Sequence, residues 1–390
     1  MTSTGKRIII IGGSLGGLFA GILLRSIGWE ADIYERSPHS LDSRGGGVVL
    51  QPEVVEAFQR SGVAYEAPLG VVARERLYLQ KDGSIAHRMS MGQILTSWNL
   101  LYGTMRRHFP TEHYHQGKNL IDIQTEGERV TAIFADGTRE TGDLLVGADG
   151  ANSTVRQHLL PSYEPRYAGY VAYRGLVNEA ELDRQTANLL TERFVFHQFP
   201  NSHILQYVIP GENGSLVPGE RRFNWVWYVN YDEATELSQV LTDKNGNRRD
   251  YSIPPGTMAP EVEREMRSYA ERVLAPPFQQ LVAATRQPFV QAILDLGVPQ
   301  MAFERIVLVG DAAFIPRPHT AASVSKAAAN AIALADALQD ARDLPKALKA
   351  WEGEQLQLGM YLWKAGQDLG DRSQFMYGKK RLAEIPDAVA

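Results

Sequence analysis

Three short runs of large apolar residues mark the chain, at residues 8–11, 144–146 and 306–309. Each run leads at once into a turn that contains glycine and, in the two later runs, aspartate. Unbroken apolar runs of this length, ended by turn residues, are typical of strands buried on both faces of a parallel sheet. The pattern therefore predicts an α/β fold whose sheet takes strands from distant parts of the chain.

The first run opens a strand–helix–strand unit. Residues 12–17 read GGSLGG, and apolar residues then recur at helical spacing as far as Gly28. Residues 31–34 predict a second strand, which ends at Glu35. A glycine turn between strand and helix suits a diphosphate, because a Cβ would block its approach and the helix N-terminus offers free N–H groups.

Two details of this unit bear on its ligand. Glu35 lies 18 residues (35 − 17) after Gly17, close to the ~20 expected of an acid that binds ribose hydroxyls. Ser14 replaces the middle glycine of the G-x-G-x-x-G pattern, and a serine still allows close approach. The fingerprint predicts an adenine dinucleotide without separating NAD from FAD, and a tight turn without a ligand is the alternative.

The middle of the chain has a different pattern. It is rich in aromatic residues, alternates like strands of an antiparallel sheet, and is expected to form a second domain. The predicted strands there are 167–177, 194–199, 203–209 and 223–231.

Other segments complete the predicted architecture. Helices are expected at 52–60, 98–109 and 344–369, and a helix followed by a break at 261–277. A hairpin is expected at 76–89 and a β-meander at 118–137. We expect a nucleotide-binding domain at 1–74, 99–166 and 285–343, a substrate-binding sheet domain at 75–98 and 167–284, and a C-terminal helical segment at 344–390.

Composition narrows the classes of function. The 390 residues carry a formal net charge of −5 and no cysteine. This charge gives no general attraction to nucleic acid or anionic lipid, and the lack of cysteine excludes disulfides and thiolate metal sites. No apolar run approaches the ~20 residues that span a bilayer, and a strand that begins within seven residues leaves no room for a signal peptide. We therefore expect a cytoplasmic protein without a metal site.

The two later apolar runs lead into motifs of their own. Residues 147–156 read GADGANSTVR, and residues 310–318 read GDAAFIPRP. A dinucleotide turn followed by these two motifs resembles the FAD-dependent aromatic hydroxylases, the single-component flavoprotein monooxygenases, over nearly the whole chain. The resemblance implies a Rossmann-like FAD-binding domain of the glutathione reductase and p-hydroxybenzoate hydroxylase type, with an inserted, mainly antiparallel sheet domain.

The resemblance also assigns roles along one bound FAD. Glu35 would hold the adenosine ribose, and Asp149 would help to hold the diphosphate while its motif also serves NAD(P)H. Asp311 would bind the ribityl chain, and the helix near Ala321 would direct its N-terminus at the flavin pyrimidine, where reduced flavin is anionic. The expected cofactor-binding residues are Gly12, Ser14, Leu15, Gly17, Glu35, Arg36, Gly46, Gly47, Gln51, Leu120, Asp149, Asp311, Pro318, Ala321, Ala322 and Ser323.

Five positions depart from the family pattern. Phe314 replaces a histidine, Asn330 an aspartate and Tyr102 an arginine that reaches the FAD in many members. Ala322 and Ser323 stand where many members carry glycine. Flavin binding tolerates such changes more easily than a specific substrate does.

The glycine run at 45–47 comes just before a strand-like segment. Such a run indicates a backbone that passes close to a flat or bulky group. A flexible loop tip is the alternative.

The implied reaction is the hydroxylation of a small hydroxylated aromatic or N-heteroaromatic ring with FAD, NAD(P)H and O2, through a flavin C4a-hydroperoxide. Such a site needs a hydrogen-bonding base beside a flat apolar pocket. His319 is the leading candidate, because a histidine titrates in the right range; bracing its loop is the alternative. Tyr207, Tyr228 and His197 are weaker candidates, since packing in a sheet also explains them.

Five further residues receive an interpretation, and one of them receives two. Arg174 could bind an anionic substrate or pair with a neighbouring acid. Trp225 and Trp227 fit the alternating aromatics of a sheet, and Lys326 and Lys364 fit solvated helix faces.

Two other functions stay open at this point. One is a FAD monooxygenase of a larger isoprenoid or polyketide substrate, which a larger pocket would indicate. The other is a FAD-binding protein that senses redox state or a ligand without hydroxylating it. The expected partner is a small aromatic substrate, and binding to nucleic acid or to a membrane is not expected. Whether the chain forms a homodimer stays open.

Overall fold

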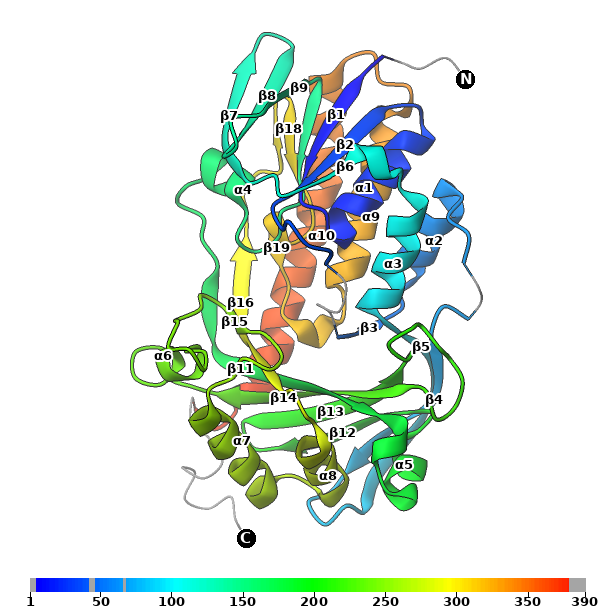
Figure 1. Ribbon diagram of the computed structural model, residues 1–390, viewed down its shortest axis with the longest axis vertical. Coiled ribbons are helices and arrows are strands. Elements are labelled where there is room, and N and C mark those ends of the chain that lie inside the picture. The colour runs from blue at the N-terminus through cyan, green and yellow to red at the C-terminus, as the bar shows by residue number, and fades with distance from the viewer. Residues whose placement is uncertain (1–4, 42–45, 66–67, 379–390) are drawn as a thin grey trace.

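The computed structural model describes residues 5–41, 46–65 and 68–378, and its upper half is built on a six-stranded sheet (Figure 1). Five of the six strands are parallel, and three of these five contain the apolar runs. The sixth strand, β17, pairs antiparallel with β18. The strand order is β17 (Ala302–Phe303), β18 (Ile306–Leu308), β10 (Leu144–Gly147), β1 (Arg7–Ile11), β2 (Glu30–Glu35) and β6 (Tyr114–Gln116).

Different layers cover the two faces of this sheet (Figure 1). On one face lie helices that pack against one another and against the sheet. They are α1 (Leu15–Ser26), α2 (Pro52–Ser61), α3 (Trp98–His108), α9 (Ser323–Gln339) and the upper part of α10 (Leu344–Gln374). On the other face lies the predicted meander, a three-stranded sheet of β7 (Leu120–Glu126), β8 (Arg129–Phe134) and β9 (Arg139–Gly142). Ile8, Ile9 and Ile10 are 0 % exposed between these layers, as the apolar pattern predicts.

The lower half is a ten-stranded, mainly antiparallel sheet (Figure 1). The pair β12–β4 is parallel, and β19 (Phe314–Ile315) joins at β16. The other nine strands of the sheet lie side by side in the order β15 (Ser252–Ile253), β16 (Phe289–Gly297), β11 (Arg166–Asn178), β14 (Arg222–Asn230), β13 (Ser202–Ile209), β12 (Arg193–Phe199), β4 (Val71–Leu79), β5 (Ile85–Ser97) and β3 (Gly47–Val49).

Alternation along the strands gives this sheet two different faces. Trp225 and Trp227 point to the outer face, which α7 (Pro260–Val273) and α8 (Pro276–Ala284) cover; Trp227 stacks on Tyr269 of α7 at 5.3 Å. Tyr228, the next residue along β14, points to the opposite face and lies 4.5 Å from His319. We call this second side, turned toward the nucleotide motifs, the inner face. The interpretation of the two tryptophans as sheet aromatics is confirmed.

Some predicted boundaries shift in the structure. The helix and the break expected at 261–277 are present: α7 ends at Val273, and Leu274 and Ala275 are not helical. A second helix, α8, then begins at Pro276, because Pro276 and Pro277 suit a first helical turn and cannot continue a helix. The helix expected near Ala321 begins at Ser323. The shorter helices are α4 (Thr154–Leu159), α5 (Arg184–Leu190) and α6 (Leu237–Val240), with 3₁₀ turns at η1 (Thr111–His113), η2 (Glu179–Glu181), η3 (Gly310–Ala312) and η4 (Pro318–Thr320).

The ten-stranded sheet crosses the predicted domain ranges. Strand β3 falls within 1–74 and β16 within 285–343, the ranges expected for the nucleotide domain, yet both pair into the large sheet. The chain therefore passes between the two halves more often than hydrophobic patterning indicates.

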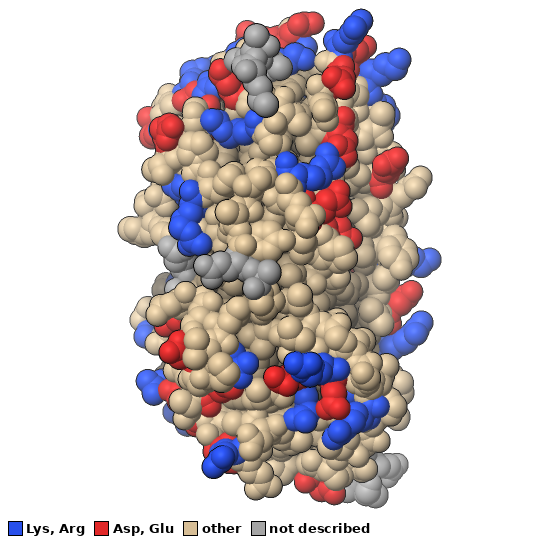
Figure 2. Space-filling view, turned by 90° about the vertical axis from the view of Figure 1, so that its right-hand side faces the viewer, with Lys and Arg blue, Asp and Glu red and all other residues tan. Residues whose placement is uncertain are grey.

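The surface gives two further observations. Within residues 5–41, 46–65 and 68–378, no helix has the length and apolar character that crossing a membrane requires. On the face shown in Figure 2, Lys and Arg side chains interleave with Asp and Glu and form no large basic patch. That face offers no surface of the kind that binds a polyanion.

Candidate cofactor and substrate site

The three sequence motifs meet at one edge of the six-stranded sheet. They follow β1, β10 and β18, which are neighbouring parallel strands and therefore end at the same carboxyl edge. The Val309 amide donates to the Gly147 carbonyl at 2.9 Å. A Cβ on Gly12 would lie 2.4 Å from the Ala148 carbonyl oxygen, and Gly12 has a φ of +108°. The motifs therefore converge in space as the sequence predicts.

A cavity of about 310 Å³ opens at this edge. Its volume lies at the lower end of the range for small-ligand pockets, about 300–1,000 Å³. Sequence reasoning identified six of its lining residues and missed the others, of which Trp98, Lys118 and Asn119 belong to no motif. The six are Gly12, Ser14, Glu35, Arg36, Leu120 and Asp149, and the others are Ile11, Tyr34, Leu41, Trp98, Lys118, Asn119, Ala148, Gly150 and Thr154.

Glu35 ties the glycine turn to the end of β2. Its Oε2 accepts a hydrogen bond from the Gly13 amide and its Oε1 from the Ser37 amide, both at 2.8 Å. Each carboxylate oxygen keeps a second lone pair for another donor. The position at the cavity and the fixed orientation both suit the expected contact with a ribose.

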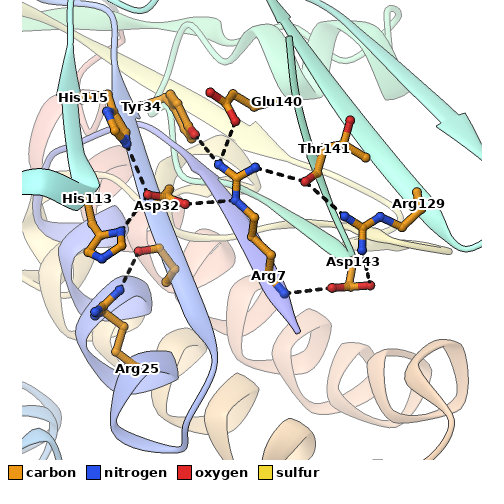
Figure 3. A network of polar contacts seen from close by, with 11 residues as sticks. Arg7, Arg25, Asp32, Tyr34, His113, His115, Arg129, Glu140, Thr141 and Asp143 are labelled. Atoms are coloured by element: carbon orange, nitrogen blue, oxygen red, sulfur yellow. Dashed lines mark hydrogen bonds and ion pairs between the residues drawn. The ribbon is translucent and has the colours of Figure 1, made fainter. Parts of the chain in front are cut away.

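A polar network holds β2 behind the cavity (Figure 3). The Arg7 guanidinium donates to Asp32 at 3.0 Å and to the Tyr34 hydroxyl at 2.9 Å. His113 and His115 contact the same Asp32 oxygen at 2.9 and 3.2 Å. Burial opposes the ionisation of Asp32, but these hydrogen bonds hold its pKa below the ordinary value. The network thereby fixes Tyr34, which lines the cavity.

Tyr102, at the position of the family arginine, lies beneath the glycine turn. It is buried, and its hydroxyl lies 3.2 Å from that of Tyr114, which donates to the Gly13 carbonyl at 2.9 Å. Its ring stacks on Trp98 at 4.6 Å, and Trp98 lines the cavity. At this position the chain therefore has an aromatic side chain that packs beneath the glycine turn, in place of the cationic side chain of the family arginine.

Asp149 joins the cavity to the start of α4. Its carboxylate accepts from the Ser153 hydroxyl at 2.5 Å and from the Val155 amide at 3.2 Å. Burial raises the pKa of Asp149, and these hydrogen bonds oppose the rise. The residue thus braces the second motif and also faces the expected diphosphate position.

Arg156 has a role that sequence reasoning missed. It is 0 % exposed and donates to the carbonyls of Ala151 at 2.6 Å, Tyr163 at 3.0 Å and Ala312 at 3.1 Å. Ala312 belongs to the third motif, so this guanidinium clamps the second motif to the third. The only sequence signal was its place as the last residue of the GADGANSTVR motif.

Asp311 is held by two donors from the first turn of α9. The Ser323 hydroxyl donates to its Oδ1 at 2.7 Å, and the Lys326 ammonium donates to the same oxygen at 2.9 Å and to the Phe314 carbonyl. Lys326 is 2 % exposed, so its interpretation as a solvated residue is wrong. Because the first turn of α9 packs on η3, the side chain of Lys326 lies in the interior. Lys364 is exposed, as expected.

Two other departures connect the third motif to α10. Asn330 accepts from the Gly310 amide at 3.0 Å and donates to Gln355 at 2.8 Å. Phe314 packs on Gly359, where a Cβ would lie 2.3 Å from its ring. Both residues serve the packing of the turn.

The entry to α9 lies between the third motif and the large sheet. Pro318 begins η4, Ala322 is the N-cap of α9, and Ser323 is its first residue. Ala321 has a φ of +53° and packs against the cluster that contains Tyr207. A left-handed alanine costs about 1–3 kcal/mol, so the rest of the structure imposes this turn.

The glycine segment docks on the inner face. The Gly47 amide donates to Asn224 Oδ1 at 2.8 Å, and a Cβ on Gly47 would lie 2.4 Å from the Tyr207 ring. A Cβ on Gly46 would lie 3.0 Å from Asn224 Oδ1. The predicted close approach is therefore present at Gly47. Arg44 and Gly45 lie outside the described residues.

Ten of the sixteen expected cofactor residues do not line the cavity, and three of these lie at the starts of α1 and α2. Leu15 and Gly17 lie in the first turn of α1, and Gln51 is the N-cap of α2. A Cβ on Gly17 would lie 1.9 Å from the Gly12 carbonyl oxygen. Gly17 is therefore required by the packing of the turn against its own helix.

His319 lies in an aromatic cluster on the inner face. Its Nε2 is 2.9 Å from the Tyr170 hydroxyl, and its ring is 4.5 Å from Tyr228 and 5.2 Å from His203. Burial, with His203 and Arg317 nearby, lowers the pKa of His319 well below 6.5. The argument that it titrates near neutrality is therefore wrong in this structure, where the imidazole is neutral at pH 7.

The other candidate residues divide between the two faces. Tyr207 and Tyr228 lie on the inner face with His319. Burial raises the pKa of Tyr228 to about 12, so its hydroxyl stays protonated and is able to donate a hydrogen bond. His197 lies on the outer face, where its Nδ1 accepts from the Ala275 amide at 3.2 Å. The sheet separates His197 from the site.

Three buried histidines predict how stability depends on pH, His319 and two others. Burial lowers the pKa of His197 and of His203 from 6.5 to about 4. Between these values the unfolded chain binds protons that the folded one does not, so stability falls as the pH drops through this range. We expect each residue to reduce the free energy of unfolding by about 2 kcal/mol between pH 7.5 and pH 5, measured by urea denaturation. A His203→Gln variant should show a shallower dependence, and an equal free energy at both pH values would contradict the prediction.

The chain is similar in sequence to proteins of known activity. A family model described as "FAD binding domain-like" matches residues 167–295. The 2,6-dihydroxypyridine 3-monooxygenase of Paenarthrobacter nicotinovorans is 36% identical over 92% of this chain and 89% of its own. The 6-hydroxynicotinate 3-monooxygenase of Pseudomonas fluorescens is 27% identical over 87% and 84%.

Solved structures agree with the sequence comparison. That of 2,6-dihydroxypyridine-3-hydroxylase from Arthrobacter nicotinovorans matches with a TM-score of 0.90 and 34% identity, over 96% of this chain and 94% of that one. Klebsiella pneumoniae HpxO, complexed with FAD and uric acid, has the same fold, with a TM-score of 0.79 and 21% identity over 96% and 90%. The motifs, the fold and the relatives agree, and the chain belongs to the FAD-dependent aromatic hydroxylases, flavoprotein monooxygenases that use NAD(P)H and O2.

Proposed function

We propose that this enzyme hydroxylates a small hydroxypyridine-like ring, with the ring placed against the inner face of the large sheet. The observation that carries the proposal is the position of Tyr207, Tyr228 and His319 on that face, beside the entry to α9. The relatives named above, whose names refer to dihydroxypyridine and hydroxynicotinate, support a hydroxylated N-heteroaromatic substrate.

We assign FAD to the edge where the three motifs converge. Glu35 and Arg36 would hold the adenosine end, and Asp149 and the N-terminus of α1 the diphosphate. Asp311 would bind the ribityl chain, and the N-terminus of α9 would face the flavin pyrimidine. When bound, FAD accepts a hydride from NAD(P)H and activates O2.

The remaining residues of the site orient the ring. Tyr207 and Tyr228 stay protonated and can donate hydrogen bonds to ring oxygens, because burial raises the pKa of both hydroxyls. The neutral His319 can donate or accept one hydrogen bond. Together they hold an oxygenated ring flat against an apolar wall that includes Leu205 and Val226.

We also propose the setting in which the enzyme works. A cytoplasmic location fits the lack of cysteine. Substrate binding by the large sheet and nucleotide binding by the parallel sheet remain the proposed domain division. A homodimer is proposed as the assembly, and light scattering of the purified protein tests it.

The purified protein tests the function directly. We expect a yellow preparation that releases FAD on denaturation, and dihydroxypyridines should accelerate its NAD(P)H oxidation at least tenfold and yield a hydroxylated product. Phenols and polycyclic ketones serve as comparison panels. Acceleration by polycycles alone would favour a larger substrate, and bound FAD without acceleration by any ring would favour a sensing protein.

A further inference from the structure

The end of α10 joins the two halves of the molecule. The helix runs from the six-stranded sheet to the large sheet (Figure 1), and it contacts β13, β14, β16 and the 3₁₀ turn η4. We call residues 370–378, its last turn and the segment after it, the C-terminal clasp. The elements around the clasp carry the aromatic cluster of the proposed ring site, which is Tyr170, His203, Tyr228 and His319.

An ion pair fastens the clasp to η4. The Arg317 guanidinium donates to Asp371 of the clasp at 2.7 Å, and to the two oxygens of Asp295 on β16 at 2.9 and 2.6 Å. Arg317 is buried and lies two residues before His319. Charged hydrogen bonds of this kind fix geometry as well as adding energy. The place of η4, and of His319 on it, therefore depends partly on the clasp.

Hydrogen bonds fasten the clasp to two inner strands of the large sheet. Ser373 Oγ lies 2.5 Å from Nδ1 of His203 on β13. Asn230, the last residue of β14, donates to the Gln374 carbonyl at 2.7 Å. Both His203 and Asn230 are buried. The last turn of α10 is therefore packed into the large sheet and does not lie loosely on its surface.

The turn between β12 and β13 binds the segment that follows the helix. Asn201 is buried there; its Oδ1 accepts from the Tyr377 amide at 2.9 Å, and its Nδ2 donates to the Gly378 carbonyl at 2.7 Å. Its φ of +56° is left-handed, a conformation that asparagine adopts more readily than most residues. One buried side chain thus holds the main chain of the clasp at two points.

Phe375 is the residue of the clasp that packs on the inner face. Its ring lies edge-on to Tyr170 at 5.8 Å and packs against the apolar cluster that contains Tyr228. Two glycines make room for this packing. A Cβ on Gly169 would lie 3.1 Å from the Phe375 ring, and one on Gly370 would lie 2.5 Å from the Tyr170 hydroxyl. The clasp and β11 therefore fit each other closely around Tyr170.

Tyr170 connects Phe375 to the ring site. Its hydroxyl lies 2.9 Å from His319 Nε2, and the residue is 0 % exposed. Without the Phe375 ring, Tyr170 would lose packing on one side and water would reach it there. Oxygen transfer from a reduced flavin requires that water is kept from the reacting atoms. The contact therefore bears on both the geometry and the dryness of the site.

We propose that the C-terminal clasp is part of the ring site, with Phe375 as a positioning residue that holds Tyr170 and His319 and closes this end of the inner face to water. The proposal rests on the proposed function for the place of the ring. In the coupled reaction, NAD(P)H, H⁺, O2 and the ring give NAD(P)⁺, water and the hydroxylated ring. In the uncoupled reaction, NAD(P)H, H⁺ and O2 give NAD(P)⁺ and H2O2, and the ring is unchanged.

The competing explanation is that Phe375 only stabilises the fold. A residue with that role alone would lower the melting temperature when it is removed. It would leave the ring affinity of the folded enzyme and its yield of H2O2 unchanged. A positioning residue changes both of these quantities, so they separate the two explanations.

The experiment uses the FAD-loaded enzyme and a dihydroxypyridine. Ring binding is followed by difference absorbance, and H2O2 and hydroxylated product are each measured per NAD(P)H consumed. We expect Phe375→Ala to weaken ring binding by about 10-fold and to raise the share of H2O2 by about threefold or more. FAD affinity should stay within about twofold. Phe375→Leu, which keeps most of the apolar volume, should recover most of both losses, and Phe375→Val should fall between.

Met376→Ala is the matched control, because Met376 is the next residue of the clasp and is 69 % exposed; it should change neither quantity. The proposal is overturned if Phe375→Ala binds the ring and yields product as the wild type does, if Met376→Ala has the same effects, or if FAD affinity falls as much as ring affinity. Should Phe375→Ala fail to fold, the order of wild type, Phe375→Leu and Phe375→Val decides, and equal values in all three overturn the proposal. An enzyme whose ring affinity depends on Phe375 but which hydroxylates no ring would refute the proposed function and leave the positioning role standing.

Discussion

Gly17→Ala is expected to weaken FAD binding by about 100-fold or more, whereas Gly16→Ala should leave it within about threefold. A Cβ on Gly17 would lie 1.9 Å from the Gly12 carbonyl oxygen, which is backbone and cannot rotate away. The turn that is expected to hold the diphosphate would have to move. A Cβ on Gly16 would make ordinary contacts, 3.8 Å from Ala327 Cβ and 3.9 Å from Ala148 Cβ.

The two variants are neighbours in the first turn of one helix, so each controls for the other. FAD affinity is measured by the quenching of flavin fluorescence, and stability by thermal unfolding of the apoprotein. Alanine is the better helix former by about 0.5–1 kcal/mol, so Gly16→Ala should raise the melting temperature slightly. Equal FAD affinities in both variants would show that the turn does not hold the cofactor.

Lys326→Met should weaken FAD binding by about 10–100-fold, because charged hydrogen bonds contribute about 1.5–3 kcal/mol each. The ammonium donates to Asp311 Oδ1 and to the Phe314 carbonyl. Without it, Ser323 is the one remaining donor to the Asp311 carboxylate among the described residues, and the Phe314 carbonyl loses a buried donor. The expected contact with the ribityl chain depends on that orientation. Calorimetric titration of the apoprotein with FAD measures the change.

Lys364→Met is the control, because Lys364 lies exposed on α10 and its substitution removes the same charge. It should leave FAD affinity unchanged. A loss of FAD in both variants would point to net charge, and a Lys326→Met protein that binds FAD normally would remove Lys326 from the site. Circular dichroism of both apoproteins separates a lost site from a lost fold.

The strands, the helices and the convergence of the motifs could be predicted because they follow from local rules. The apolar run 8–11 requires burial on both faces, and the glycines after it permit only a tight turn into a helix. Once three such strands are parallel neighbours, their turns share one edge. Glu35, Asp149 and Arg36 were found at the cavity for that reason.

The interior contacts of the site could not be predicted in the same way. Arg156 reaches the carbonyl of Ala312, and Asn330 the amide of Gly310, across long stretches of sequence. Trp98 lines the cavity because α3 packs beside the glycine turn, and no motif surrounds it. Such contacts depend on how the two sheets and their helices pack.

The sequence by itself determined the fold class, the edge at which the three motifs meet and the family, since hydrophobic period, turn sterics and motif order can be read along the chain. Tertiary structure alone decided the charge environment: that Lys326 is buried, that His319 is neutral and that Arg174 forms no ion pair with an acid among the described residues. The physical reason is that solvation and ionisation depend on groups that distant segments bring within a few ångströms, and a linear pattern does not contain those distances.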